Sequence, residues 1–218
     1  MIATNRDLRQ RAFGENYTPT VIDRLGIWLS ARRVRKCVSS FDGKRVADIG
    51  CGYHAVFART LLDQVGSMLL VDVSLEARLR DHHKVTGLEG HLPDTLERVP
   101  SESIDVLVCN SVVEHLWEPL VTLRHFWRIT AQGGVCLINV PSWLGKRALE
   151  FSAFRLGASP PEEMDDHKAY YDPRDLWPML VRAGFLPHDI RCFRHKLGLN
   201  TFAICRKQQV RAEVRTHE

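Results

Sequence analysis

Short apolar runs alternate along this chain with stretches whose apolar residues recur at helical spacing. The runs predict β-strands at residues 45–49, 67–72, 84–89, 105–109, 135–140, 187–194 and 200–206. The helical spacing predicts helices at residues 4–12, 19–38, 54–64, 75–81, 113–129 and 173–183. Because the first five strands alternate with helices, we expect them to form a parallel sheet. The last two strands are separated only by a short turn at Gly198, which predicts an antiparallel hairpin.

The same periodicity suggests how the chain is divided. Residues 1–42 are predicted to form an N-terminal helical cap, and residues 43–207 an α/β domain. Within that domain the periodicity weakens over residues 141–171, where the consecutive prolines at 160 and 161 are followed by a mainly acidic run. We interpret this stretch as a lid-like insertion over the sheet. Residues 208–218 are predicted to be a basic C-terminal tail.

Composition limits the function without choosing it. The chain has 218 residues, of which 44% are apolar, and it contains no apolar run long enough to span a membrane. Its beginning is polar and lacks the apolar region of a signal peptide, so we expect a cytoplasmic protein. The six cysteines are scattered without a CxxC pair, so we expect neither disulfides nor a metal site. The net charge of +4 is concentrated in two basic clusters, which indicate either a solvated surface or contacts with phosphate.

A glycine-rich turn after the first strand carries the strongest chemical signal. Gly50 and Gly52 allow a sharp turn beside a ligand, and Asp72 ends the second strand. The spacing also satisfies a loose dinucleotide-binding fingerprint, but a pyrophosphate at this turn would meet the carboxylate of Asp48. S-adenosylmethionine carries an ammonium and a sulfonium instead of a phosphate. Asp48 therefore favours S-adenosylmethionine as the cofactor.

The order of these segments resembles the class I S-adenosylmethionine-dependent methyltransferases, in particular the small-molecule enzymes of the type 11 and type 23 sequence families. The resemblance covers residues 44–206, and its matching stretches are residues 46–52, 69–72, 104–110, 113–116, 133–141 and 171–185. It implies a Rossmann-like three-layer sandwich around a seven-stranded, mostly parallel sheet. The implied strand order is 3-2-1-4-5-7-6, with strand 7 antiparallel.

The resemblance also implies a set of cofactor contacts. The methionine portion would lie against the turn, the ribose against the acid that ends strand two, the adenine against the turn after strand three, and the sulfur near the end of strand four. The residues at these positions are Asp48, Gly50, Gly52, Asp72, His91, Leu92 and Asn110. One departure is His54, which stands where the family usually has a third glycine.

The acceptor is expected to be a small molecule with a hydroxyl group. Enzymes that methylate amino nitrogens of bases commonly carry Asn-Pro-Pro-Tyr after strand four, whereas this chain continues from Asn110 with Ser-Val-Val. A hydroxyl usually needs a base, and His115 and His167 are the candidates. Two acidic residues precede His167 and could orient its imidazole. Tyr17, Tyr170 and Tyr171 are candidate acceptor contacts. Tyr17 could equally be a packing aromatic, and Tyr170 and Tyr171 could instead anchor the lid.

Three other functions remain open at this point. The basic surface would suit an RNA methyltransferase, although no RNA-binding motif accompanies it and nucleic acid is an unlikely partner. The departure at His54 would suit a non-catalytic nucleotide-binding relative of the fold. The loose fingerprint leaves a nicotinamide dehydrogenase as a further alternative. The sequence is compatible with a monomer or a homodimer.

Overall fold

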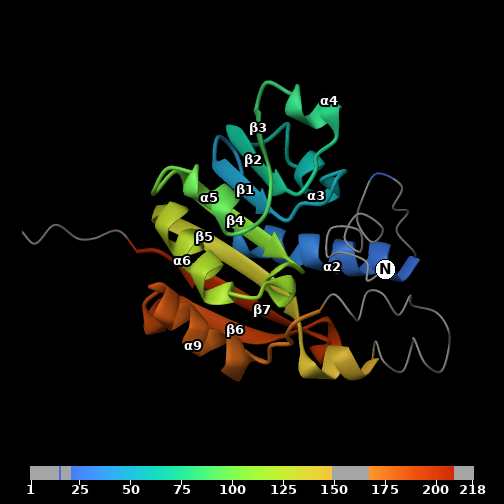
Figure 1. The fold of residues 1–218 in the computed structure, drawn as a ribbon, viewed down its shortest axis with the longest axis vertical. Coiled ribbons are helices and arrows are strands. Elements are labelled where there is room, and N and C mark those ends of the chain that lie inside the picture. The colour runs from blue at the N-terminus through green and yellow to red at the C-terminus, as the bar shows by residue number, and fades with distance from the viewer. Residues whose placement is uncertain (1–14, 16–20, 149–166, 209–218) are drawn as a thin grey trace, which may run out of the picture.

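A seven-stranded sheet forms the centre of the computed structural model, which describes residue 15 and residues 21–148 and 167–208. The strands lie side by side in the order β3-β2-β1-β4-β5-β7-β6 (Figure 1). Their bounds are β1 Arg45–Ile49, β2 Ser67–Asp72, β3 Val85–Glu89, β4 Ile104–Asn110, β5 Thr130–Pro141, β6 Ile190–His195 and β7 Asn200–Arg206. β7 pairs antiparallel with both β5 and β6, and the other pairs are parallel. The predicted fold class and the closing hairpin are confirmed.

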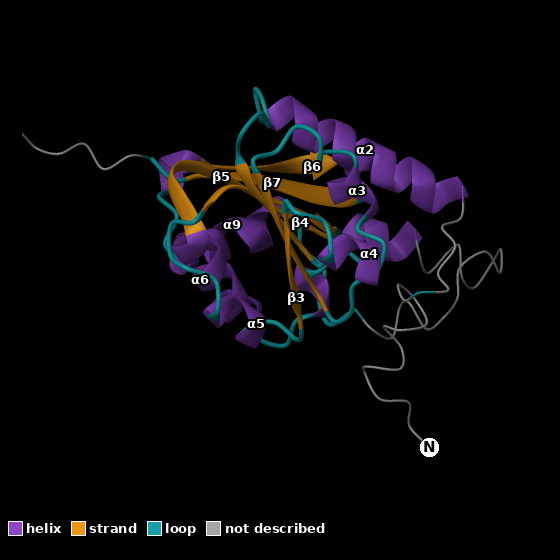
Figure 2. Cartoon of the chain, turned by 90° about the horizontal axis from the view of Figure 1, so that it is seen from above, coloured by secondary structure: helices purple, strands orange, loops and turns teal. Residues whose placement is uncertain are grey.

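Helices cover both faces of the sheet. Viewed from above, α2, α3 and α4 lie on one side, and α5, α6 and α9 lie on the other (Figure 2). The helices are α2 Val21–Cys37, α3 Val56–Arg59, α4 Ala77–Arg80, α5 Asp94–Glu97, α6 Pro119–Ile129 and α9 Pro173–Ala183. Three 3₁₀ turns accompany them: η1 Val113–His115, η2 Pro187–Asp189 and η3 Lys196–Gly198.

Each face of the sheet has its own apolar core. On the α6 and α9 side, Phe126 and Leu176 pack with side chains of the central strands. On the other side, Val34 from α2 and Phe57 from α3 pack against the sheet together with Phe202. Strands buried on both faces require nearly continuous apolar sequence, which is the pattern that made the strands predictable.

Local chemistry explains where α9 begins and ends. Asp172 and Asp175 form a capping box in which each side chain accepts a hydrogen bond from the other residue's backbone N–H. Pro173 occupies the first turn, where no backbone donor is needed. Gly184 ends the helix with a φ of 121°, a value that side chains with a Cβ rarely adopt. The predicted helix at residues 173–183 is confirmed.

The predicted single helix at residues 113–129 is wrong, because the chain forms η1 and α6 instead. Pro119 occupies the first turn of α6, and a proline disfavours helical geometry in the residue before it. Glu118 accordingly has a φ of −120° and a ψ of 66°. His115 therefore lies in a short 3₁₀ turn at the carboxyl end of β4, not on a long helix.

Several expectations concern residues outside the described part of the chain. These are the helix at residues 4–12, Tyr17, the acidic residues before His167, most of the predicted insertion and most of the basic tail. The predicted division of the chain at residues 42, 141, 171 and 207 stays a prediction. Within the described ranges, no helix is long and apolar enough to cross a membrane.

Candidate active site

The glycine-rich turn joins the carboxyl end of β1 to α3, and two of its residues have a backbone that requires glycine. Gly50 and Gly52 have φ values of 71° and 72°. A Cβ on Gly50 would lie 2.1 Å from Cγ2 of Val112, so packing also excludes a side chain at this position. A Cβ on Gly52 would meet nothing within 4 Å. Gly50 therefore fits the turn against the loop after β4, and Gly52 leaves space beside the backbone.

Two carboxylates lie at this turn, at the ends of neighbouring parallel strands. Asp48 is buried, with 4% of its surface exposed. Burial and, second, the nearby charge of Asp72 raise the pKa of Asp48 to about 7. Oδ2 of Asp72 accepts a hydrogen bond from Gly52 N at 2.7 Å, and Oδ1 accepts one from Val73 N at 2.8 Å. Asp72 is not a helix N-cap, because α4 begins five residues later, after Glu76.

His54 turns away from the two acids. Its Nδ1 lies 3.2 Å from Oε2 of Glu76, and its Nε2 lies 3.1 Å from the backbone oxygen of Glu15. Arg59 contacts the same Glu76 carboxylate. The residue that departs from the family pattern is therefore held by partners outside the two-acid site, and it does not fill the space beside Gly52.

A hollow of about 230 Å³ lies between the turn after β3 and the loop after β4. His91 and Leu92 line it from the first side, and His115 and Trp117 line it from the second. The structure thus brings the two predicted adenine contacts together with one of the two predicted catalytic histidines. A planar ring bound here would lie at the carboxyl edge of the sheet, which is where open α/β sheets bind ligands.

Asn110 ends β4 and carries a polar atom that suits a ligand. Its Oδ1 is buried and has no hydrogen-bond partner among the described residues. The next residue, Ser111, has a φ of 54°, an unusual value for a residue with a side chain. Its N–H donates to the backbone oxygen of Asn139 at 2.8 Å, which holds the bend against β5. An acceptor that is buried without a donor is expected where a bound molecule supplies one.

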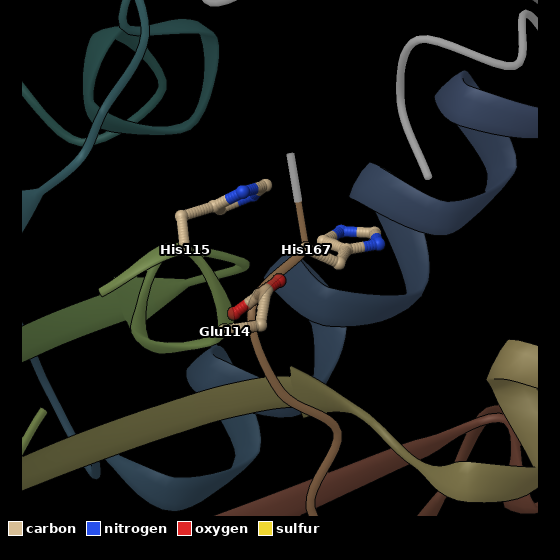
Figure 3. Close-up of side chains that lie close together, drawn as sticks. All are labelled: Glu114, His115 and His167. Carbon is tan, nitrogen blue, oxygen red and sulfur yellow. The ribbon is translucent and has the colours of Figure 1, made fainter. Parts of the chain in front are cut away.

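Beyond this bend, the two predicted catalytic histidines meet. The ring centroids of His115 and His167 are 4.7 Å apart. Nδ1 of His167 lies 3.1 Å from the hydroxyl of Tyr170. Figure 3 shows the carboxylate of Glu114 below and between the two imidazoles. The sequence did not single out Glu114, because a lone glutamate beside a histidine has no distinctive spacing.

The two described tyrosines that the sequence assigns to the acceptor are both buried. Tyr170 has 7% of its surface exposed and lies with its ring centroid 5.7 Å from that of Trp143. Tyr171 has 6% exposed and belongs to the core on the α9 side. Burial, and next the charge of Glu114, raise the pKa of Tyr171 to about 12. Tyr170 lies at the histidine pair, whereas Tyr171 packs in the apolar core.

The strand order, the glycine turn and the two acids together define a class I S-adenosylmethionine-dependent methyltransferase. The profile of the methyltransferase domain family matches residues 7–188, and the chain belongs to this family. Relatives include two ubiquinone biosynthesis O-methyltransferases. The one from Psychrobacter arcticus is 23% identical over 75% of this chain and 67% of the relative. The one from Aliivibrio fischeri is 25% identical over 80% of this chain and 77% of the relative.

Solved structures agree on the fold. The S-adenosylmethionine-dependent methyltransferase from Archaeoglobus fulgidus superposes with a TM-score of 0.61 at 19% identity, covering 83% of this chain and 94% of that one. An S-adenosylmethionine-dependent methyltransferase from Mesorhizobium loti gives a TM-score of 0.58 at 16% identity, covering 80% of this chain and 96% of that one. The cofactor of this protein is S-adenosylmethionine, and its reaction is methyl transfer.

The residues at the turn fit this cofactor. An ammonium or sulfonium beside Asp48 would stabilise its ionised form, which burial and Asp72 otherwise disfavour. A carboxylate has about four lone-pair sites, so Asp72 can accept from ribose hydroxyls as well as from the two backbone donors. Gly52, with open space beside it, follows β1, and Asn110, with its unpartnered oxygen, ends β4, so both residues lie at the carboxyl edge of the sheet.

Proposed function

We propose that this protein methylates a hydroxyl oxygen of a small molecule, such as an aromatic ring, a sugar or a lipid-linked compound. The observation that carries the proposal is the histidine pair at the carboxyl end of β4, in which His115 follows Asn110 by five residues and His167 contacts Tyr170. Direct methyl transfer requires in-line approach of the acceptor, and a hydroxyl must also lose its proton. The relatives named O-methyltransferases support the same chemistry.

The proposed cofactor contacts follow from the geometry of the turn. Asp48 would face the cationic methionine portion, and Gly52 would let the backbone approach it. Asp72 would accept from the ribose hydroxyls. His91 and Leu92 would contact the adenine in the hollow that they line.

The reaction needs few groups from the protein. When bound, S-adenosylmethionine supplies a methyl group activated by a positively charged sulfur. Asp48, Gly52 and Asp72 would hold it, and it would supply the methyl group to an acceptor oxygen whose hydroxyl proton must be removed. Asn110 would position the reacting groups, and His115 and His167 would promote loss of the proton.

The test is a methyl-transfer assay with cofactor labelled in its methyl group. A panel of catechols, quinols, saccharides and an RNA transcript would be offered separately, and the labelled atom would be located by mass spectrometry and NMR. We expect the label on an oxygen of a small molecule. A label on RNA, or on a nitrogen or carbon, would overturn the proposal.

Variants tie the reaction to the histidine pair. We expect His167→Ala to lower turnover while affinity for S-adenosylhomocysteine, measured by calorimetry, stays nearly constant. His188→Ala is the matched control, because His188 is exposed near the start of β6. Unchanged turnover in His167→Ala would remove the histidine pair from the reaction.

A further inference from the structure

A group of exposed apolar side chains lies at the tip of the β6–β7 hairpin and on the elements beside it. Leu197 stands at the tip with 98% of its surface exposed. Leu25 and Trp28 on α2, and Trp143 and Leu144 in the segment after β5, are each about half exposed. We refer to these five residues as the hairpin patch. Single exposed apolar residues are common, but a group on neighbouring elements indicates a binding surface.

Contacts at the hairpin tip bring these elements together. Nζ of Lys196 lies 3.6 Å from the position that a Cβ on Gly26 would take, so the tip adjoins α2. On the other side, Ser142 N donates to the backbone oxygen of Leu199 at 3.0 Å, and the Ser142 hydroxyl donates to that of Gly198 at 2.6 Å. The segment after β5 therefore lies beside the end of the β6–β7 hairpin (Figure 1).

The backbone at the tip holds Leu197 in solvent. Lys196 and Leu197 have φ values of 49° and 57°, which residues with a Cβ rarely adopt. Such a conformation costs free energy and persists only where the surrounding structure imposes it. Here Leu199 N donates to the backbone oxygen of Lys196 at 3.1 Å, and Ser142 holds the following residues. The fold thus fixes an apolar side chain at a position where it has contact with water alone.

The elements that carry the hairpin patch are basic. Residues 24–37, 142–148 and 190–200 contain no aspartate or glutamate. Arg24 and Arg32 on α2 and Arg194 on β6 are exposed. Cζ of Arg32 lies 5.4 Å from the centre of the Trp28 ring. Apolar side chains surrounded by positive charge complement a bilayer surface, whose headgroups are anionic and whose interior is apolar.

Other partners fit this surface less well. A nucleic acid would suit the arginines, but its bases stack on aromatic rings, whereas the tip presents the aliphatic side chain of Leu197. A second copy of this chain, related by two-fold symmetry, would bring the same positive charges against each other. A tryptophan with an arginine beside it is typical of the bilayer interface, where the ring lies at headgroup level and the guanidinium reaches phosphate.

We propose that the hairpin patch docks this protein on the surface of a bilayer that contains anionic lipids. Leu197 enters the headgroup region, Trp28 and Trp143 lie at its border, and the exposed arginines bind lipid phosphates. The binding is peripheral and reversible, because only a few side chains leave water. It weakens with salt, because the charges act across solvent.

The hairpin patch adjoins the proposed acceptor site. The ring centroid of Trp143 lies 5.7 Å from that of Tyr170, whose hydroxyl contacts Nδ1 of His167. A docked molecule therefore holds its histidine pair close to the lipid headgroups. This step rests on the proposed methylation of a hydroxyl, and it narrows the substrate class to acceptors that carry a lipid tail and present their hydroxyl at headgroup level.

Co-sedimentation of the full chain with lipid vesicles tests the docking. We expect binding to vesicles of phosphatidylcholine mixed with phosphatidylglycerol, and weak binding to phosphatidylcholine alone. Leu197→Asp and the uncharged Leu197→Gly should each weaken binding at least about 10-fold, since each removes a buried leucine side chain from the complex. Leu186→Asp is the matched control, because Leu186 is an exposed leucine before η2, at the opposite edge of the sheet. It should leave binding unchanged.

Fluorescence quenching locates the contact. Lipids brominated in their acyl chains should quench part of the tryptophan emission, and Trp28→Phe should remove part of that quenching. Both Leu197 variants should fold, as checked by circular dichroism, because the side chain is in solvent and glycine adopts the left-handed backbone freely. Absence of binding to the anionic vesicles, or equal binding by the wild type and both Leu197 variants, would overturn the proposal. So would binding to an RNA transcript without binding to vesicles.

Failure of docking can be distinguished from failure of the proposed function. Leu197→Gly should methylate a water-soluble acceptor from the panel above at the wild-type rate, and it should lose rate only with an alkyl-chain derivative embedded in vesicles. Equal rates of both proteins on the vesicles would overturn the lipid-tailed acceptor. Vesicle binding that depends on Leu197, combined with methylation of a nitrogen or of RNA, would retain the docking surface and overturn the proposed function.

Discussion

Replacing Asp48 by asparagine should stabilise the folded protein at pH 8 and weaken its binding of cofactor. The carboxylate has 4% of its surface exposed and faces Asp72, so its ionised form is costly in the folded chain. Asparagine has nearly the same shape and no charge. The substitution therefore removes an unfavourable electrostatic interaction and, with it, the charge proposed to hold the cationic end of the cofactor.

The size of the effect follows from the pKa of Asp48, which rises from 3.8 to about 7 on folding. Between these values the folded protein holds a proton that the unfolded chain has released, so stability falls as the pH rises. A rise of about three units in the pKa corresponds to roughly 4 kcal/mol of folding stability. Nearly all of this stability is lost by pH 8. About a third of this is already lost at pH 5. The stability advantage of Asp48→Asn should therefore grow by about 2–3 kcal/mol from pH 5 to pH 8.

Urea denaturation of both proteins at several pH values measures this difference, and other titrating groups cancel in the comparison. Asp63→Asn is the matched control, because Asp63 is an exposed aspartate on the loop before β2. The difference in unfolding free energy between Asp63→Asn and the wild type should stay constant with pH. A constant difference between wild type and Asp48→Asn from pH 5 to pH 8 would refute the argument. So would an unchanged affinity for S-adenosylmethionine in calorimetry.

Three further outcomes are expected. Gly50→Ala should lower the free energy of unfolding, measured by urea titration, by about 3 kcal/mol or more, because its Cβ would collide with Val112. Gly52→Ala should lower it by only about 1 kcal/mol and chiefly impair binding of S-adenosylhomocysteine. Equal stabilities of the two variants would contradict this. Asp72→Asn should lower the pKa of Asp48 and shrink the pH-dependent difference described above, and an undiminished difference would exclude this coupling. Three buried thiols, whose pKa values burial raises, should react with a thiol reagent only after unfolding, and rapid labelling of the folded protein would contradict their burial. They are Cys109, Cys136 and Cys205.

The strands could be predicted from sequence because their apolar runs are buried on both faces of the sheet. β1, β2 and β7 begin and end where the pattern places them. β5 is longer than predicted, because its first residues, 130–134, interrupt the apolar run. The helix after β4 was predicted with the wrong length, because helical spacing continues across Pro119 although the backbone does not. Periodicity reports which side chains are buried, and a proline changes the backbone without changing that pattern.

The sequence predicts the candidate site only where its residues lie in one short segment or at the ends of adjacent parallel strands. The glycine turn and Asp72 follow from adjacent strands of a parallel sheet, so their proximity can be read from the sequence. The contact between His115 and His167 joins residues 52 positions apart, and it depends on the two backbone bonds to the carbonyl of Glu114. No pattern in the sequence encodes those bonds. The proximity of the two histidines therefore emerges only from the fold.

The loss of folding stability caused by ionised Asp48 and the binding of its ligand are linked. Roughly 4 kcal/mol is a large share of the stability of a domain this size, and a ligand at a hundred times its dissociation constant contributes about 2.7 kcal/mol. A cation beside Asp48 lowers its pKa, so ligand binding and ionisation of this carboxylate favour each other. S-adenosylmethionine should consequently raise the melting temperature of the wild type more at pH 8 than at pH 5. Asp48→Asn should remove this difference, because its side chain has no proton to lose.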